Sequence, residues 1–489
     1  MDLDVVDLSR AQFALTIMFH YLFPPLSIGL GVIMVVLEAL ALKTGDDAYE
    51  RATRWWTKVF AVNFAVGVAS GIVMEFQFGT NWATYSRFVG DVFGSALASE
   101  GNFAFFLESG FLAILVFGWD RVSKKMHFFS TCMVSLGSIF SAVWIVIANS
   151  WQQTPRGFHL VGEGAAMRAE ITDFWAMIFN PSAMHRLNHV LLGSFVQGAF
   201  FVMSIAAFYL LKKRHEDFAK KSFRVALGLG TVASLALLVS GHSQANAVSV
   251  NQPAKLAAFE GHFETGPADL YLFGVPNAET REVDYGVAVP GMLSVLIHGD
   301  AEVPVKGLDA IPEDEHPPLV VPFVSYRLMV GLGTLFIGMT VLASFLLWRG
   351  TLWDKTWLLR AFVLAVAGPV IANQAGWVAA EVGRQPWVVY GLLKTVDAVS
   401  TTVPGEHVLA SLILFGIVYV ALGCVWLFVV NEKIQHGPAD ALPPERPSRG
   451  SFIEVAAEVT DPAAPTGLAV FSDFPPPSDV PPVTVGEAE

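Results

Sequence analysis

The chain has 489 residues, of which 54% are hydrophobic and 15% charged, and its mean hydropathy is +0.53. This composition excludes an ordinary soluble globular protein and indicates a protein with many membrane spans. The formal net charge of −13 argues against a nucleic-acid partner, because acids gather in one loop and in the last segment. Cys132 and Cys424 both lie in apolar runs, so we expect no disulfide framework, no Cys metal site and no Cys-x-x-Cys-His haem attachment.

Nine segments are apolar enough, and long enough at about 1.5 Å per residue, to cross roughly 30 Å of hydrocarbon. The first follows acids rather than Lys or Arg, so we expect a retained helix and not a signal peptide. An odd number of spans places the two termini on opposite sides. The prediction is an all-α polytopic membrane protein with helices at 11–42, 55–78, 94–118, 127–149, 184–211, 220–243, 322–348, 357–382 and 407–430.

Basic residues are concentrated in the connections after the first, third, fifth and seventh predicted helices. By the positive-inside rule these connections are cytoplasmic, so the N-terminus faces out and the C-terminus faces in. Connections 150–183, 244–321 and 383–406 are then extracytoplasmic. The basic residues are Lys43, Arg51, Arg54, Arg121, Lys124, Lys125, Lys212, Lys213, Arg214, Lys220, Lys221, Arg349 and Lys355.

Composition divides the chain into four parts. Helices one to six occupy 1–243, a long extracytoplasmic loop occupies 244–321, and helices seven to nine occupy 322–431. The segment 432–489 is rich in Pro and acid and has too few apolar residues for a core, so we expect a disordered cytoplasmic tail. We find no internal repeat.

Unusual side chains recur at one depth of the predicted bundle, within about 15 Å of its outer surface. Ionisable groups are costly in hydrocarbon, so a layer shared by five helices indicates one functional assembly. Histidine nitrogen and methionine sulfur are axial ligands of haem iron, which makes a haem site one interpretation. Interhelical hydrogen bonds for the histidines, and a proton or ion path for the acids, are the alternatives. The residues are His20, Glu100, His189, Met329 and Glu381.

The long outer loop contains a second group of polar residues in "NQPAKLAAFEGHFET". Pro253 can start a helix, and the spacing brings Lys255 and Glu260 within reach of one side. At the membrane surface, a lysine and an acid could hold and deprotonate a hydroquinone headgroup. An ordinary exposed amphipathic helix is the alternative.

Six stretches together carry a family resemblance. They are "QFALTIMFHYLFPPLSIGL", "GNFAFFLESGF", "WQQTPRGF", "NQPAKLAAFEGHFET", "SYRLMVGLG" and "GWVAAEVGRQPW". Over roughly residues 1–430 the chain resembles subunit I of the cytochrome bd quinol:oxygen oxidases. The loop, about 78 residues by these boundaries, resembles the shorter loop variant of that family, whereas the acidic tail departs from its common pattern.

The resemblance implies two haem b groups, one haem d and the residues that hold them. His189 and Met329 would ligate the low-spin haem b, His20 the haem d and Glu381 the high-spin haem b. Either order of the last two ligands, and haem b instead of haem d at the oxygen site, stay open. In the same pocket Glu100 would be a distal ligand or the last proton donor, and Trp377 would pack near the haems.

Three further charged residues gain a role beside these ligands. Arg384 follows Glu381 by about one turn and would pair with that carboxylate or with a haem propionate, unless it only reaches for the headgroups. Arg327 could serve the low-spin haem in the same way. Glu108 lies about 12 Å inward of Glu100 on the same helix, so protons could pass from the cytoplasm through Glu108, whose alternative role is a buried neutral acid.

The activity implied is that of a terminal oxidase in the bacterial cytoplasmic membrane. It would oxidise quinol at the outer face and reduce dioxygen to water with cytoplasmic protons, generating a proton motive force without pumping. Its partners would be a subunit II, possible small single-helix subunits and the lipid bilayer. An ion-coupled transporter would also bury acids, but it favours repeats and midplane sites. A bis-His cytochrome b would need paired histidines on facing helices, which the sequence does not offer.

Overall fold

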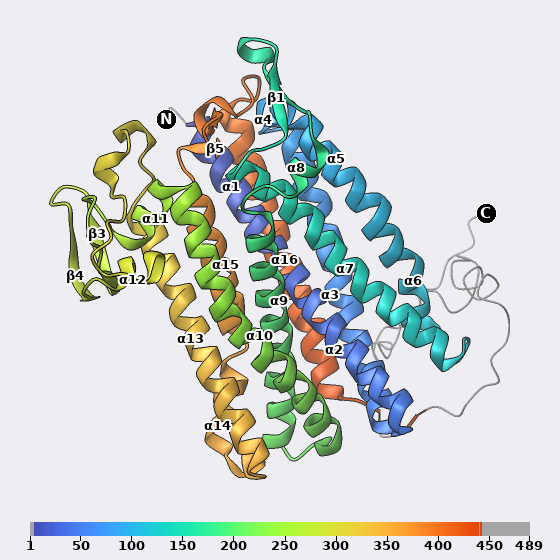
Figure 1. The fold of residues 1–489 in the computed structure, drawn as a ribbon. Helices are drawn as coiled ribbons and strands as arrows, with labels where there is room; N and C mark the ends of the chain where they lie inside the picture. Colours follow the sequence, from blue (N-terminus) through green and yellow to red (C-terminus); the bar gives the residue numbers. More distant parts are fainter. Residues whose placement is uncertain (1–3, 440, 443–489) are drawn as a thin grey trace, which may run out of the picture.

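The computed structural model describes residues 4–439 and 441–442. Within them the chain forms a bundle of long, roughly parallel helices, with small hairpins and short helices gathered at one end (Figure 1). We call this the loop end and the opposite end, where the basic connections lie, the basic end. The positive-inside rule assigns the loop end to the outside. The predicted tail 432–489 falls largely on residues outside the described part, and its first residues, through His436, continue the last helix.

The predicted all-α membrane architecture is confirmed. In the described residues eight helical segments are long and apolar enough to span a membrane, or nine when one bent pair counts as a span. The segments are Val5–Thr44 (α1 Val5–His20 and α2 Phe23–Thr44), α3 Asp47–Gly79, Gly90–Phe117 (α5 Gly90–Ser99, a π-helix Glu100–Phe105 and α6 Phe106–Phe117), α7 Lys124–Gln153, α9 Ala183–Leu211, α10 Glu216–Asn251, α13 Val320–Trp348 and α16 Gly405–His436; the bent pair is α14 Thr356–Leu364 with α15 Ala367–Val382.

Several predicted boundaries differ from the structure, among them the start of the second helix, which begins at Asp47 and not at residue 55. The first helix begins at Val5 rather than at residue 11, because the Asp4 side chain caps it by accepting a hydrogen bond from the Val6 amide. The sixth helix runs to Asn251, so the long loop begins at 252 and not at 244. Segment 244–251 is less apolar but contains no helix breaker, and Pro253 is the first residue that stops the helix.

Helix breaks coincide with predicted site residues. The first span breaks directly after His20, and Pro24 and Pro25 stand in the first turn of its second half. The third span contains the π-helix that begins at Glu100, a local widening that often marks functional sites. The sequence prediction treated both segments as continuous helices. At the breaks, side chains can take directions that a regular helix would not allow.

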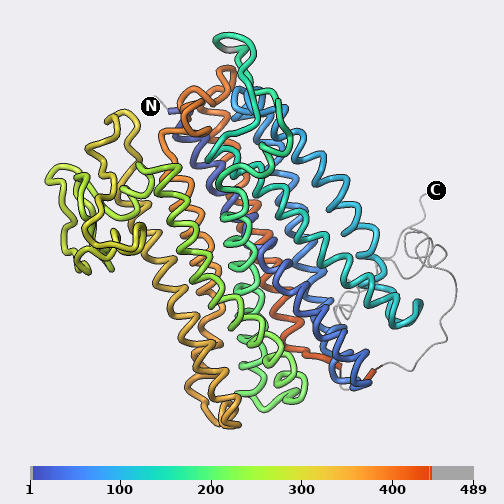
Figure 2. Tube along the Cα trace, viewed as in Figure 1, coloured from blue at the N-terminus to red at the C-terminus, as the bar shows by residue number. Residues whose placement is uncertain are grey.

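The loop end consists of three two-stranded antiparallel hairpins with short helices between them. The long loop lies to one side of the bundle and is well separated from the first hairpin (Figure 2). Within this long loop, helix α11 packs on α10 and α13. The elements are α4 Ala83–Phe88, β1 Phe158–Val161, β2 Arg168–Ile171, α8 Phe174–Ile178, α11 Pro253–Glu260, β3 Leu270–Asn277, β4 Glu282–Val289, α12 Met292–His298, β5 Trp387–Val389 and β6 Leu393–Lys394, with 3-10 turns at Gly164–Ala166, Leu308–Ala310, Glu313–Glu315 and Thr395–Asp397. A further 3-10 turn, Leu352–Asp354, joins α13 to α14 at the basic end.

Helix α9 lies at the centre and packs against α2, α7, α10 and α14. Its contact with α2 depends on two glycines, since a Cβ on Gly29 would lie 2.4 Å from the Ser194 carbonyl oxygen and one on Gly198 would lie 2.5 Å from the Gly29 carbonyl carbon. Small residues allow membrane helices to approach this closely. This contact holds the first span beside the helix that carries His189.

Candidate functional site

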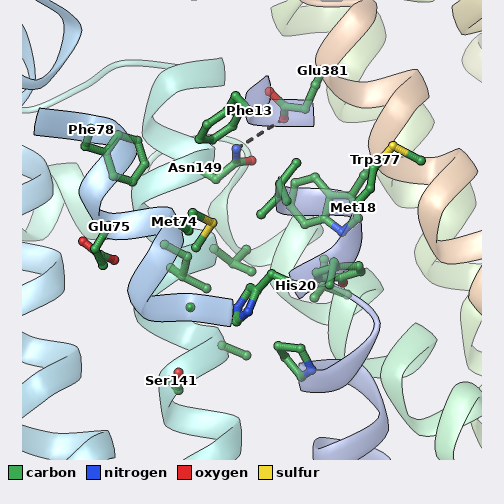
Figure 3. Close-up of a pocket in the computed structure, with 18 of the residues that line it drawn as sticks. Phe13, Met18, His20, Met74, Glu75, Phe78, Ser141, Asn149, Trp377 and Glu381 are labelled. Atoms are coloured by element: carbon green, nitrogen blue, oxygen red, sulfur yellow. Dashed lines mark hydrogen bonds between the residues drawn. The ribbon is translucent and has the colours of Figure 1, made fainter. Parts of the chain in front are cut away.

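A cavity of about 1120 Å³ opens among the spans toward the loop end. It exceeds the roughly 300–1,000 Å³ of an ordinary small-molecule pocket. Figure 3 shows His20, Trp377 and Glu381 around this space, on segments far apart in the sequence. Apolar side chains such as Phe13, Phe78 and Met74 supply much of the wall. Predicted site residues that line the cavity are His20, Glu100, Glu108, Trp377, Glu381 and Arg384.

The environment of His20 suits a metal-ligating imidazole. Its Nδ1 lies 3.0 Å from the Ser70 hydroxyl, which in turn donates to the Val66 or Gly67 carbonyl at 3.0 Å. Because that hydroxyl uses its proton on a carbonyl, Nδ1 is the donor and Nε2 keeps its lone pair. A Cβ at Gly71 would lie 3.1 Å from the His20 ring, so this glycine leaves space for the imidazole.

His189 stands on α9 and Met329 on α13, two helices that both contact α10 and α15. The His189 Nδ1 lies 3.3 Å from the Ser240 hydroxyl of α10. Met329 packs against α15, where a Cβ on Gly376 would lie 2.7 Å from its sulfur. Neither residue lines the large cavity. The structure therefore separates this pair from His20 and Glu381, as two haem sites require.

Glu381, at the end of α15, is held by several donors. Arg384 pairs with its Oε2 at 2.5 Å, and Arg186 approaches its Oε1 at 3.6 Å. Asn149 and Gln153 of α7 donate to Oε1 at 3.2 and 3.1 Å. Arg384 is only 6% exposed. This burial favours pairing with the carboxylate over the alternative, in which the Arg384 side chain reaches for the lipid headgroups. The predicted contact between Arg384 and Glu381 is present.

Positive charge exceeds negative charge around this carboxylate. Arg186, Arg384 and Lys255 all interact electrostatically with Glu381. Buried cations need anionic partners, and a single carboxylate cannot serve three of them. Among the described residues, the Arg186 Nε is a buried donor without a hydrogen-bond partner. The residues present thus fit the anionic propionates of a haem bound beside Glu381.

Sequence reasoning missed several members of this cluster. Arg186 stands one turn before His189, and a cation at that depth is itself a functional signal. Asn149 and Gln153 lie at or near the quoted "WQQTPRGF". Glu75 lines the cavity as a further intramembrane acid. The unused signal in each case was a polar residue close to the end of a span.

Glu100 and Glu108 face the cavity from the broken third span. The Ser141 hydroxyl of α7 donates to the Glu100 carboxylate at 2.5 Å. Helix α7 also approaches Glu108 closely, since a Cβ on Gly137 would lie 2.5 Å from its Cγ. Both acids therefore lie between α7 and the cavity, with Glu108 nearer the basic end.

Helix α11 is buried, which rules out the exposed amphipathic helix. Lys255 and Glu260 are each 2% exposed. The Lys255 ammonium donates to Gln153 and, at 2.6 Å, to Gln252, so it points toward the Glu381 cluster. Glu260 instead pairs with Arg327 at 2.6 Å. Lys255 and Glu260 therefore have separate partners, whereas the sequence predicted that both side chains reach the same side of the helix.

Burial changes the proton affinity of both loop residues. Desolvation, together with the nearby arginines, lowers the pKa of Lys255 well below its ordinary value. Desolvation raises the pKa of Glu260, although the Arg327 guanidinium opposes the shift. A carboxylate with a raised pKa binds a proton more tightly than an ordinary glutamate does.

The Arg327 guanidinium is occupied by groups of the long loop. Its Nε donates to the Tyr271 carbonyl at 3.1 Å, one terminal nitrogen donates to the Phe259 carbonyl, and the other pairs with Glu260. Its guanidinium therefore ties the long loop to α13. A role at the low-spin haem stays a prediction.

Comparison with known proteins gives the chain its family. Residues 8–438 match the family of cytochrome bd terminal oxidase subunit I. The chain is 40% identical over 441 residues to the cytochrome bd ubiquinol oxidase subunit 1 of Bacillus subtilis (strain 168), covering 88% of this chain and 93% of that protein. It is 33% identical over 513 residues to the cytochrome bd-II ubiquinol oxidase subunit 1 of Escherichia coli (strain K12), covering 91% and 99%.

The fold agrees with a solved structure of the same kind. The bd oxidase from Geobacillus thermodenitrificans superimposes with a TM-score of 0.82 at 32% identity, covering 90% of this chain and 100% of that chain. The resemblance inferred from the six sequence stretches is confirmed, and the transporter and bis-His cytochrome alternatives are wrong. The chain belongs to the cytochrome bd terminal oxidase subunit I family.

Proposed function

We propose that this chain is the haem-carrying subunit of a quinol oxidase that reduces dioxygen to water. The observation that carries the proposal is the single large cavity that unites His20, Glu381 and Glu100 beneath a surplus of buried cations. When bound, the haems would pass electrons singly and activate dioxygen. The chain's own residues hold those groups, move protons and exclude water.

The ligand assignments follow the sequence prediction. His189 and Met329 would hold the low-spin haem b, His20 the haem d and Glu381 the high-spin haem b. The hydrogen bonds to Ser70 and Ser240 support this, because each orients its imidazole through Nδ1. Arg186 and Arg384 would receive propionates, and Trp377 would pack near the cavity haems, since the Arg186 guanidinium lies 5.5 Å from its ring.

Quinol oxidation is assigned to the loop end beside α11. Glu260 would accept a proton from the quinol hydroxyl, for which its raised pKa is suited. Arg327 would keep that carboxylate in place and stabilise its ionised form. Lys255 connects the loop to Glu381 through Gln153, which bonds both side chains. Movement of α11 on quinol binding would thus reach the Glu381 cluster directly.

Protons for water formation would arrive from the basic end through Glu108 and Glu100. Both acids face the cavity, and Ser141 orients Glu100. With quinol protons released at the loop end and consumed protons taken from the other side, turnover separates charge across the bilayer without a pump. In the bacterial cytoplasmic membrane this generates a proton motive force.

A second subunit would complete the enzyme. Helix α16 exposes many apolar side chains, as expected for a helix covered by lipid or by another membrane protein. The proposed partner is a subunit II, with small single-helix subunits as possible additions. Exposed apolar residues of α16 include Ile413, Leu414, Ile417, Val420, Val425, Leu427 and Phe428.

A reduced-minus-oxidised optical spectrum of the purified two-subunit protein, with and without carbon monoxide, tests the proposal. We expect b-type bands beside a far-red band of haem d that carbon monoxide shifts. Variants of His20, Glu381, His189 and Met329 would then assign the ligands through the band each one removes. Correctly folded protein without haem would overturn the proposal.

A further inference from the structure

The hairpin β3–β4 of the long loop exposes a cluster of apolar side chains. Its strands pair Leu270 with Val289 and Phe273 with Val287. Monomeric soluble domains rarely expose contiguous apolar patches of this kind without a binding partner. The exposed members are Leu272, Phe273, Val275, Tyr285, Val287 and Val289.

Most of the cluster lies at one end of the hairpin. Leu272 and Phe273 directly follow Tyr271, whose carbonyl accepts a hydrogen bond from Arg327 of α13, and Val287 and Val289 flank its strand partner Ala288. The tip carries a polar sequence instead, with exposed Glu279, Thr280, Arg281 and Glu282. The hairpin is therefore amphipathic along its length, and its apolar end touches a membrane-spanning helix.

The contact with α13 fixes the depth of this apolar end. Helix α13 has 29 residues, which at 1.5 Å per residue make about 43 Å, the thickness of a bilayer with its headgroups. Arg327 stands seven residues from the outer end of α13, about 10 Å along the axis. A headgroup layer is roughly 5–8 Å thick on each side. Tyr271 therefore lies near the boundary between headgroups and acyl chains.

The exposed apolar surface of α13 continues into the hairpin. The first turns of α13 expose Val320, Val321, Val324 and Leu328, and β3 packs on this helix. Figure 1 shows the hairpin beside the upper part of α13, on the outside of the bundle. The apolar end of the hairpin thus forms one surface with exposed apolar residues of a helix long enough to span the membrane.

Tyr285 gives an independent indication. Its side chain is 90% exposed, although its backbone has a φ of +54°. A left-handed conformation is costly in a residue other than glycine, and no side chain in the described part of the chain buries the ring to compensate. Tyrosine is enriched at the membrane interface, where its ring enters the acyl region and its hydroxyl stays among the headgroups.

We propose that the β3–β4 hairpin is a membrane-interface anchor, whose apolar end rests in the outer leaflet of the bilayer while its polar tip stays in water. Its ligand is the lipid surface. Arg327 bonds Tyr271 of this hairpin, so the anchor also fixes the depth of the Glu260–Arg327 pair. A lipid-soluble quinol carries its headgroup at that depth. The anchor itself does not depend on the proposed oxidase activity.

Spin labels on single cysteines test the anchor in the assembled two-subunit protein, reconstituted in phosphatidylcholine–phosphatidylglycerol bilayers after Cys132→Ala and Cys424→Ala. Accessibility is measured to oxygen, which concentrates in lipid, and to a water-soluble nickel chelate. The test site is Tyr285→Cys, with Phe273→Cys as a second position if the first variant fails to fold. Leu335→Cys, exposed in the middle of α13, is the lipid control, and Leu160→Cys in the β1–β2 hairpin is the water control.

We expect labels at 285 and 273 to collide with oxygen more than with the nickel chelate, as at 335, and a label at Thr280→Cys to resemble the water control. Labels at 285 and 273 that match position 160 would overturn the proposal, because the hairpin would then stand in water. Labels shielded from both reagents would overturn it as well, since another protein would cover the surface. None of these readings requires turnover.

Discussion

At the residue scale, the buried acids and bases of the site differ in the groups that they contact. Lys255 and Glu260 are equally buried, yet one is bonded to neutral amides and the other to a guanidinium. Glu260 keeps a counter-charge beside it and still has a raised pKa, because desolvation is the larger effect. This environment makes Glu260 a stronger proton acceptor than an exposed glutamate.

Glu260→Gln removes that proton acceptor. We expect the rate of quinol oxidation to fall about 10²- to 10⁴-fold, the usual contribution of a general base, with unchanged haem spectra. In the unsubstituted chain only ionised Glu260 accepts a proton, so its raised pKa predicts a rate that increases with pH above the ordinary range of a glutamate. Rate–pH profiles of both proteins check this, and the variant should lack that limb.

Glu264→Gln is the matched control, because Glu264 stands on the same loop but is exposed. Its rate and pH profile should equal those of the unsubstituted protein. A Glu260→Gln enzyme that kept both the rate and the acid limb would place the base elsewhere.

Arg186 is the residue that the structure adds to the site. We expect Arg186→Leu to weaken retention of a haem beside Glu381, because it removes a buried charged donor worth about 1.5–3 kcal/mol, or roughly 10- to 100-fold in affinity. Haem content per chain after detergent washing, followed by optical titration with added haem, measures the effect.

Arg186→Lys keeps the charge and should restore much of the haem content. Arg214→Ala is the control, since this exposed arginine lies at the basic end, where it donates to the Gln435 carbonyl. Equal haem content in all three variants would mean that Arg186 serves the Glu381 carboxylate alone.

At the element scale, the site depends on interruptions in helices and on glycines between them. The apolar pattern predicted nine spans, and the described residues contain eight candidate spans and a bent helix pair in place of the ninth, because a span needs little more than length and hydropathy. It did not predict the π-helix at Glu100 or the break after His20, since hydropathy is the same on both sides of each break. Nor did it reveal the β3–β4 hairpin, whose strands are bulged and so lack a regular alternation of apolar and polar residues.

Gly376→Ala tests the contact between α13 and α15. A Cβ there would lie 2.7 Å from the Met329 sulfur, so the sulfur must move away. If Met329 ligates the low-spin haem, we expect the variant to lose or weaken the low-spin band and to lower the reduction potential, since a methionine ligand raises it. Redox titration followed optically measures both.

Gly331→Ala is the control for this substitution. Gly331 stands two residues from Met329 on α13, and an added Cβ would meet nothing within 4 Å. An unchanged low-spin spectrum in Gly376→Ala, with a folded and assembled protein, would contradict methionine ligation by Met329.

At the scale of the whole molecule, polar chemistry is distributed unevenly across the bilayer. His20, Glu381, α11 and the hairpins lie toward the loop end, and basic connections mark the other end. Sequence alone predicts His20, Glu100, His189, Met329 and Glu381 in one layer by counting residues along each helix, but α1 begins at Val5, so His20 lies fifteen residues, about 22 Å, from the start of its helix. The sequence could not show that His20 and Glu381 share a cavity apart from His189 and Met329, since that depends on which helices are neighbours.

This asymmetry predicts the direction of proton movement. In vesicles whose loop end faces out, quinol oxidation should release protons outside, consume protons inside and build a membrane potential, because Glu260 and Glu108 lie toward opposite sides. Internal and external pH dyes together with a potential-sensitive dye measure the three quantities. Glu108→Gln should slow internal proton uptake and turnover together, whereas Glu302→Gln, an exposed acid of the loop, should change neither. Uptake of the consumed protons from the loop end would contradict the path through Glu108. The acids of the third span would then receive protons from the quinol side, and turnover would separate far less charge across the bilayer.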